Sequence, residues 1–136
     1  MSKRISDLKY GDLNEIELTP TLQKFFNDDT LEKVKETFGV IDFIGEKVYC
    51  ELKSRRINHN QYPTCLIGCN KIKVFQQKTT DCYIVYKYLD GLFYIKYDDE
   101  LFLTFKNEIQ NVWRDGRCEK SNVLHIPVSN LQPLTL

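Results

Sequence analysis

Residues 47–55 read KVYCELKSR, and residues 39–45, just before them, read GVIDFIG. Both segments are rich in the β-branched and aromatic residues typical of strands. Gly45-Glu46 separates them and predicts a two-residue hairpin turn. The sequence therefore predicts two antiparallel strands, over residues 40–44 and 47–55, around which the remaining elements can be arranged.

The alternation of side chains along a strand groups three charged residues. It places Tyr49, Glu51 and Lys53 on one face of the second strand. With a two-residue turn, Asp42 lies opposite Tyr49 and is a diagonal neighbour of Glu51, with backbone positions about 7–8 Å apart. A three-residue turn would move Asp42 to the other face. A shared site therefore depends on the length of the turn.

An aspartate beside a Glu-x-Lys pair is the set of side chains that metal-dependent phosphodiester hydrolysis needs. Carboxylate oxygens of Asp42 and Glu51 suit Mg²⁺ or Mn²⁺. Such an ion polarises the phosphoryl group and lowers the pKa of a bound water. Lys53 can orient or deprotonate that water, or stabilise charge on the phosphoryl oxygens. The alternative interpretation is an ordinary hairpin with three charged side chains on its solvent face.

Length and composition predict one folded domain over residues 1–136. The chain is 42% hydrophobic and has 17 aromatic residues, enough for a core without cross-links. No segment of about 18 apolar residues is present, so we expect no membrane span. The N-terminus lacks a signal-peptide pattern, and the five cysteines lack the spacing of a disulfide framework. We expect an intracellular, non-secreted protein in a reducing compartment, the cytoplasm or nucleus of a host or infected cell.

Charge is distributed unevenly along a chain whose formal net charge is zero. Residues 47–80 contain seven basic residues against Glu51 alone, a local net charge of +6. The rest of the chain is correspondingly acidic, because 19 basic and 19 acidic residues balance overall. Such polarity suits one face that binds a polyanion. A cluster of ordinary solvated lysines is the alternative.

Turn and cap signals divide the rest of the chain into helices and strands. After a lead-in segment over residues 1–18, Thr19-Pro20 predicts a short helix to about Phe26. A capping box at Asp29 predicts a second helix that ends at Gly39. Downstream, the sequence predicts a strand over 62–67, a helix over 71–78, a hairpin over 82–97 with its turn at Asp90-Gly91, β structure over 101–105, a helical turn or loop over 107–113 and a strand over 123–128. These elements predict an α/β (α+β) fold.

Asp42 followed by Glu51-Leu52-Lys53 on a hairpin resembles the PD-(D/E)XK nuclease superfamily. The continuation ELKSRRINHNQYPTCLIGCNKIK is similar to the small nucleases carried by phages and large DNA viruses, and the likeness covers about residues 30–80. It implies a restriction-endonuclease-like αβββαβ core with a mixed sheet over residues 30–88. Residues 82–136 would be an added β-rich C-terminal part with a β-hairpin. The residue before Asp42 is Ile41, where the name-giving pattern of the family has proline.

The resemblance also implies roles for individual residues. Asp42 and Glu51 match the acidic metal ligands, and Lys53 matches the catalytic lysine. Members often add an acidic residue from the preceding helix, for which Glu32 and Glu36 are candidates. Glu36 is preferred because it lies closer to Asp42 and because the capping box can occupy Glu32. A polar residue on the helix after the third strand can also contribute.

Nucleic-acid contacts are expected around this site. The candidates are basic and aromatic residues in or near the polar segment that follows Lys53: Arg55, Arg56, Tyr62, Lys71 and Lys73. The predicted function is a Mg²⁺- or Mn²⁺-dependent nuclease acting on DNA, as a structure-selective or short-site endonuclease. A homodimer is expected, because one active site cuts one strand. The alternatives are a catalytically inactive nucleic-acid-binding module on the same fold and a β-rich protein–protein interaction domain.

Overall fold

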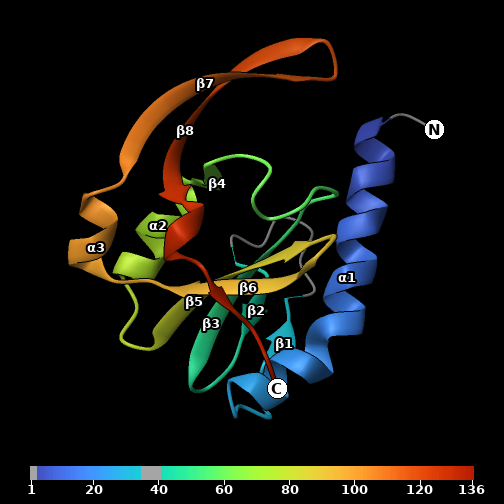
Figure 1. The fold of residues 1–136 in the computed structure, drawn as a ribbon, viewed down its shortest axis with the longest axis vertical. Helices are drawn as coiled ribbons and strands as arrows, with labels where there is room; N and C mark the ends of the chain where they lie inside the picture. Colours follow the sequence, from blue (N-terminus) through green and yellow to red (C-terminus); the bar gives the residue numbers. More distant parts are fainter. Residues whose placement is uncertain (1–2, 35–40) are drawn as a thin grey trace.

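The computed structural model describes residues 3–34 and 41–136, a mixed α/β fold built mostly of strands (Figure 1). The elements in chain order are α1 (Lys3–Phe25), β1 (Glu32–Lys33), β2 (Phe43–Ile44), β3 (Val48–Ser54), β4 (Thr64–Gly68), α2 (Cys69–Gln76), β5 (Asp81–Tyr88), β6 (Gly91–Lys96), α3 (Asp99–Leu103), β7 (Lys106–Arg114), β8 (Arg117–Pro127), the 3₁₀ turn η1 (Val128–Asn130) and β9 (Gln132–Pro133). Within the described part of the chain, no helix is both long and apolar enough to cross a membrane.

Two sheets form the body of the fold. The larger sheet is mixed and has the strand order β1-β2-β3-β5-β6-β9, in which β3 and β5 are parallel and the other neighbours antiparallel. Helix α2 lies on the connection between the parallel strands β3 and β5, which require such a crossover. The smaller sheet has the order β4-β8-β7. The strand expected over 62–67 is thus β4 of the smaller sheet and does not pair with β3.

Each face of the larger sheet covers its own apolar cluster. Val48, Cys50 and Leu52 of β3 pack with Leu22 of α1 on one face. On the other face, β5 packs against α2 and the smaller sheet, and the hydroxyl of the buried Tyr86 donates to the Leu66 carbonyl at 3.1 Å. Because side chains alternate along β3, Glu51 belongs to the face that is covered by α2.

The N-terminal helix is longer than expected. The prediction of a lead-in followed by a helix from Pro20 was wrong, because α1 already begins at Lys3 and contains Pro20 in its interior. Thr19 does not cap a helix start; its hydroxyl donates to the Glu15 carbonyl at 2.7 Å. The last turns pack Leu22 and Phe25 against the sheet, and this packing offsets the hydrogen bond that proline cannot make.

The second predicted helix was also wrong over its described part. Glu32 and Lys33 form the strand β1, which pairs with Ile44 and Phe43 of β2. The remaining residues of that prediction, 35–39, lie outside the described residues. The expected cap at Asp29 is replaced by Asp28, whose carboxylate accepts hydrogen bonds from both the backbone and the hydroxyl of Thr30. Asp28 thereby stabilises a turn in place of a helix.

Four residues, 45–48, separate the paired residues Ile44 and Tyr49, and the last of them, Val48, already belongs to β3; the predicted two-residue turn was wrong. Ile44 pairs with Tyr49, and the Gly45 amide donates to the Val48 carbonyl at 3.0 Å. Asp28 Oδ2 accepts from the amides of Lys47 and Val48 at 2.9 and 3.3 Å. This distant carboxylate satisfies the turn amides, so the wider turn is stable.

The C-terminal half contains one confirmed hairpin and two corrections. The predicted hairpin of β5 and β6 is confirmed, but its turn lies one residue earlier than expected, because Tyr88 pairs with Gly91 and the turn residues are Leu89 and Asp90. Residues 99–103 form the helix α3 in place of β structure, because the Asp98 side chain caps it by accepting from the Leu101 amide at 2.8 Å. Residues 107–113, expected as a helical turn or loop, belong to β7. Strands β7 and β8 form a long hairpin that extends away from the body (Figure 1).

Candidate functional site

Asp42, which directly precedes β2, lies next to Glu51 in the middle of β3. The pairing of Phe43 with Cys50, continued by one residue, brings Asp42 level with Glu51. The predicted register, with Ile44 opposite Lys47 and Asp42 opposite Tyr49, was wrong, because Tyr49 pairs with Ile44. The turn is longer than expected by two residues, and a shift of two preserves the alternation of faces, whereas a shift of one reverses it.

The carboxylate of Asp42 is fixed against β3. The chain bends at residues 41 and 42, so that β2 begins only at Phe43. Asp42 Oδ2 accepts a hydrogen bond from the Leu52 amide at 2.9 Å, where a longer strand would offer a backbone carbonyl. This bond holds the Asp42 carboxylate next to the residue that follows Glu51.

Glu51 is a buried carboxylate whose charge is only partly balanced by neighbouring lysines. Its side chain is 3% exposed, and its Oε1 lies 3.5 Å from Lys71 Nζ and 3.9 Å from Lys53 Nζ. Its Oε2 has no hydrogen-bond partner among the described residues. Burial, reinforced by the charge of Asp42, raises the pKa of Glu51 to about 8, although both lysines act in the opposite direction. An additional positive charge at this point would stabilise the ionised form.

A third acidic residue, Glu15 of α1, reaches the same region. Glu15 Oε2 lies 3.2 Å from Lys33 Nζ, and burial together with the charge of Asp42 raises the pKa of Glu15 to about 7. Glu15 was not among the predicted site residues, because the helix was expected to begin at Pro20 and not at Lys3. A helix extended upstream would have made it a candidate. Glu32 is exposed on β1, and Glu36 lies outside the described residues.

The donor set suits a hard divalent cation. Across residues 3–34 and 41–136, no three His, Cys, Asp or Glu side chains are already gathered as the ligands of one ion. Mg²⁺, however, is usually held by one or two carboxylates and keeps waters or substrate oxygens as its other ligands. The two carboxylates required are those of Asp42 and Glu51, and Oε2 of Glu51 has no other partner among the described residues. The residues present therefore fit Mg²⁺ or Mn²⁺.

The two nearby lysines come from different elements. Lys53 follows Glu51 on the same face of β3, and its side chain is 34% exposed. Lys71 stands in the first turn of α2 and is 17% exposed. Lys73, two residues further along α2, is exposed and lines a separate cavity against α3. Lys53 and Lys71 thus belong to the carboxylate site, whereas Lys73 does not.

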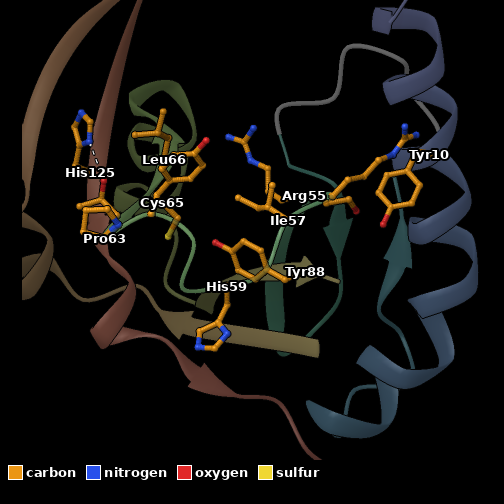
Figure 2. Close-up of a pocket in the computed structure, with 13 residues that line it drawn as sticks. Tyr10, Arg55, Ile57, His59, Pro63, Cys65, Leu66, Tyr88 and His125 are labelled. Atoms are coloured by element: carbon orange, nitrogen blue, oxygen red, sulfur yellow. Dashed lines mark hydrogen bonds between the residues drawn. The ribbon is translucent and has the colours of Figure 1, made fainter. Parts of the chain in front are cut away.

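A cavity begins at Ser54, the residue after Lys53. It has a volume of about 860 Å³ and lies between the N-terminal half of α1, the end of β3 and the start of β4 (Figure 2). Arg55, Arg56 and Tyr62 line it, as do Tyr10, Tyr88 and two histidines. Three of the expected nucleic-acid contacts are therefore gathered in one cavity, beside the carboxylates.

Comparison with known proteins adds no relative. No family model, no curated protein and no solved structure matches this chain.

Proposed function

We propose that the protein is a metal-dependent nuclease that hydrolyses phosphodiester bonds of DNA as a structure-selective or short-site endonuclease. The observation that carries this proposal is the position of Asp42 beside the buried Glu51, with Lys53 next on the same face of β3. Two carboxylates and an amine at one point of a sheet match the needs of phosphodiester hydrolysis.

Asp42 and Glu51 would hold Mg²⁺ or Mn²⁺, with Glu15 in support from α1. When bound, the ion supplies positive charge that polarises the phosphoryl group. The buried Glu51 favours such a ligand role, because a cation offsets the cost of ionising a carboxyl group with an unpartnered oxygen.

The chain's own amines have distinct roles in this mechanism. Lys53 is the more exposed of the two lysines beside Glu51, and it orients the attacking water or stabilises charge on a phosphoryl oxygen. Lys71 is the more buried lysine and holds Glu51 Oε1 from the side of α2. Lys53 therefore contacts the substrate, whereas Lys71 positions a ligand.

The order of elements supports the same proposal. Along the larger sheet and its helices, the chain runs α1, β1, β2, β3, α2 and β5, and β3 is parallel to β5. This is helix, three strands, helix, strand, with Asp42 before the second strand and Glu51-x-Lys53 on the third. Strand β4, inserted before α2, belongs to the smaller sheet.

The test is cleavage by the purified protein with Mg²⁺ or Mn²⁺ on supercoiled plasmid, linear duplex, flapped, bulged and four-way DNA, and RNA. Lys53→Ala should abolish cleavage while the melting temperature is kept. Lys96→Ala is the matched control, because Lys96 is an exposed lysine on β6 whose ion pair is with Asp81. Activity in EDTA equal to that with metal, or unaffected by Lys53→Ala, would exclude this mechanism.

A second candidate is a catalytically inactive nucleic-acid-binding module. The bond of Asp42 Oδ2 to the Leu52 amide favours it, because that carboxylate is satisfied in part without an ion. It predicts binding of DNA without cleavage, and unchanged binding when Asp42→Asn is compared with the wild type in EDTA.

A homodimer is part of the nuclease proposal only if both strands are cut, which sedimentation at the assay concentration would test.

A further inference from the structure

The cavity lined by Arg55, Arg56 and Tyr62 begins at the end of β3, one residue after Lys53 of the carboxylate site. The Arg55 amide donates to the Lys87 carbonyl at 2.8 Å, so the chain stays aligned with β5 for one residue beyond Ser54. The two-residue alternation puts Arg55 on the face of Glu51 and Lys53, with its backbone about 7 Å beyond Lys53. That spacing is close to the length of one extended nucleotide.

The cavity is cationic. No Asp or Glu is among its lining residues, and among the described residues no carboxylate pairs with the Arg55 guanidinium, which points into the cavity (Figure 2). The rings of His59 and His125 are hydrogen-bonded to the carboxylates of Asp90 and Glu108, respectively, neither of which lines the cavity. The Arg55 guanidinium is therefore a positive charge that an occupant of the cavity meets, and this charge favours an anion.

The walls of the cavity are aromatic as well as basic. Arg56 lies over the Tyr10 ring, with its guanidinium carbon 4.3 Å from the ring centroid. Tyr62 lies in the connection between β3 and β4 and is 58% exposed, although it is a large aromatic residue. Tyr88 adds a third ring on the floor of the cavity (Figure 2). Aromatic rings and guanidinium planes stack on bases, and arginine binds phosphate.

We propose that this cavity binds one unpaired nucleotide of the nucleic-acid substrate, with its base against Tyr62 and its phosphate on Arg55. The inference rests on the proposed nuclease function and narrows its substrate class. A base inside a duplex is stacked and paired, so only a single strand, a flap or a bulge offers an occupant without the cost of extrusion. The cavity volume suits a ligand of this size.

Binding can be measured without cleavage. Fluorescence anisotropy in EDTA would compare three labelled DNA probes: a single strand, a blunt duplex, and the same duplex with one bulged 2-aminopurine. We expect the single strand and the bulged duplex to bind at least about tenfold more tightly than the blunt duplex. The 2-aminopurine fluorescence should fall when its base stacks in the cavity. Equal affinity for the blunt and bulged duplexes would overturn the proposal.

Variants locate the site within the protein. Arg55→Ala and Tyr62→Ala should each weaken binding of the bulged duplex roughly tenfold, and Tyr62→Phe should keep the fluorescence change because the ring remains. Lys24→Ala is the control, an exposed cation in the last turn of α1, and should bind as the wild type does. Wild-type affinity in both Arg55→Ala and Tyr62→Ala would refute the assignment of this cavity.

The two proposals fail in different ways. If the protein prefers the bulged duplex in EDTA but cuts nothing with Mg²⁺ or Mn²⁺, the nuclease proposal fails and the nucleotide site stands. If it cuts blunt and bulged DNA at equal rates and binds them equally, the nucleotide site fails and the nuclease stands.

Discussion

Lys71 Nζ lies 3.5 Å from Glu51 Oε1, so that the first turn of α2 brings a positive charge to a buried carboxylate of the larger sheet. This contact joins two elements that pack through apolar residues elsewhere. It offsets only part of the cost of burying Glu51, whose pKa stays raised to about 8. The consequences can be measured as pH dependence, metal dependence and activity.

The stability of the protein should fall as the pH rises from about 5 to about 8. The ordinary pKa of Glu51 is 4.5 and its pKa in the fold is about 8, so between these values the folded state binds a proton that the unfolded state has lost. Glu51→Gln replaces the titrating carboxyl group by a neutral amide. The variant should therefore be more stable than the wild type at pH 8, by an amount on the order of a few kcal/mol.

Urea denaturation at pH 5 and pH 8 measures the effect. Glu15 acts in the same direction, with a pKa of about 7, so Glu51→Gln should reduce the pH slope without abolishing it. Glu46→Gln, at an exposed position in the turn before β3, is the control. An identical pH slope in Glu51→Gln and the wild type would contradict the prediction.

Mg²⁺ should raise the melting temperature more at pH 8 than at pH 6. The cation binds the ionised form of Glu51, which becomes available only near its raised pKa, and ligand binding to the folded state stabilises it. Differential scanning fluorimetry with and without Mg²⁺ at both pH values gives the difference. A Mg²⁺ shift of the same size in Glu51→Gln would place the ion elsewhere.

Glu15→Gln should weaken Mg²⁺-dependent cleavage roughly tenfold and raise the Mg²⁺ concentration needed for half-maximal rate. The carboxylate of Glu15 is close enough to Asp42 for its pKa to be raised by that charge, so its own charge favours a cation at Asp42. Glu17→Gln alters an exposed glutamate of the same helix and should have no effect. Equal Mg²⁺ titrations for the two variants would show that Glu15 has only a structural role.

Lys71→Ala should lower cleavage at pH 7 roughly tenfold and move the pH optimum upward. Lys71 lowers the pKa of Glu51, so its removal means that a higher pH is needed to ionise that carboxyl group. Lys73→Ala is the matched change on the exposed side of α2. A pH–rate profile recorded for both variants checks the prediction, and a reduced rate without a shifted optimum would speak against this positioning role.

Gly45→Ala should destabilise the protein by about 1–3 kcal/mol. A Cβ atom at residue 45 would clash with Asp28 Oδ2, and that carboxylate cannot move without losing its bonds to the turn amides. Gly11→Ala in α1 meets no atom within 4 Å and should be neutral or stabilising. Chemical denaturation of both variants compares the two sites, and a neutral Gly45→Ala would show that the turn relaxes.

The sequence predicted those features that depend on neighbouring residues. The alternation along β3 predicted the common face of Glu51 and Lys53, and the turn signal near Asp90 predicted the hairpin of β5 and β6 to within one residue. The wider turn before β3 could not be predicted, because Asp28, far away in the sequence, satisfies its amides. Separation of β4 into a smaller sheet likewise depends on its pairing with β8, about 60 residues away.

The errors in the candidate site have the same cause, because they also depend on contacts between residues far apart in the sequence. Pro20 is usual at the start of a helix, and only tertiary packing of Leu22 shows that α1 passes through it. Glu15 was therefore assigned to a lead-in segment, and the acidic partner of Asp42 was sought after residue 30. The contact of Lys71 with Glu51 needs the relative position of α2 and β3, which no local pattern encodes.

The proline inside α1 has a mechanical consequence. Leu22, after it, is anchored in the core, whereas Tyr10 and Glu15, before it, reach the cavity and the carboxylates. At Pro20 one backbone bond is missing and Thr19 binds the Glu15 carbonyl, so bending is easiest there. Because Tyr10 and Glu15 belong to the same helical segment before Pro20, a displacement of that segment would move the cavity wall and the Glu15 carboxylate together.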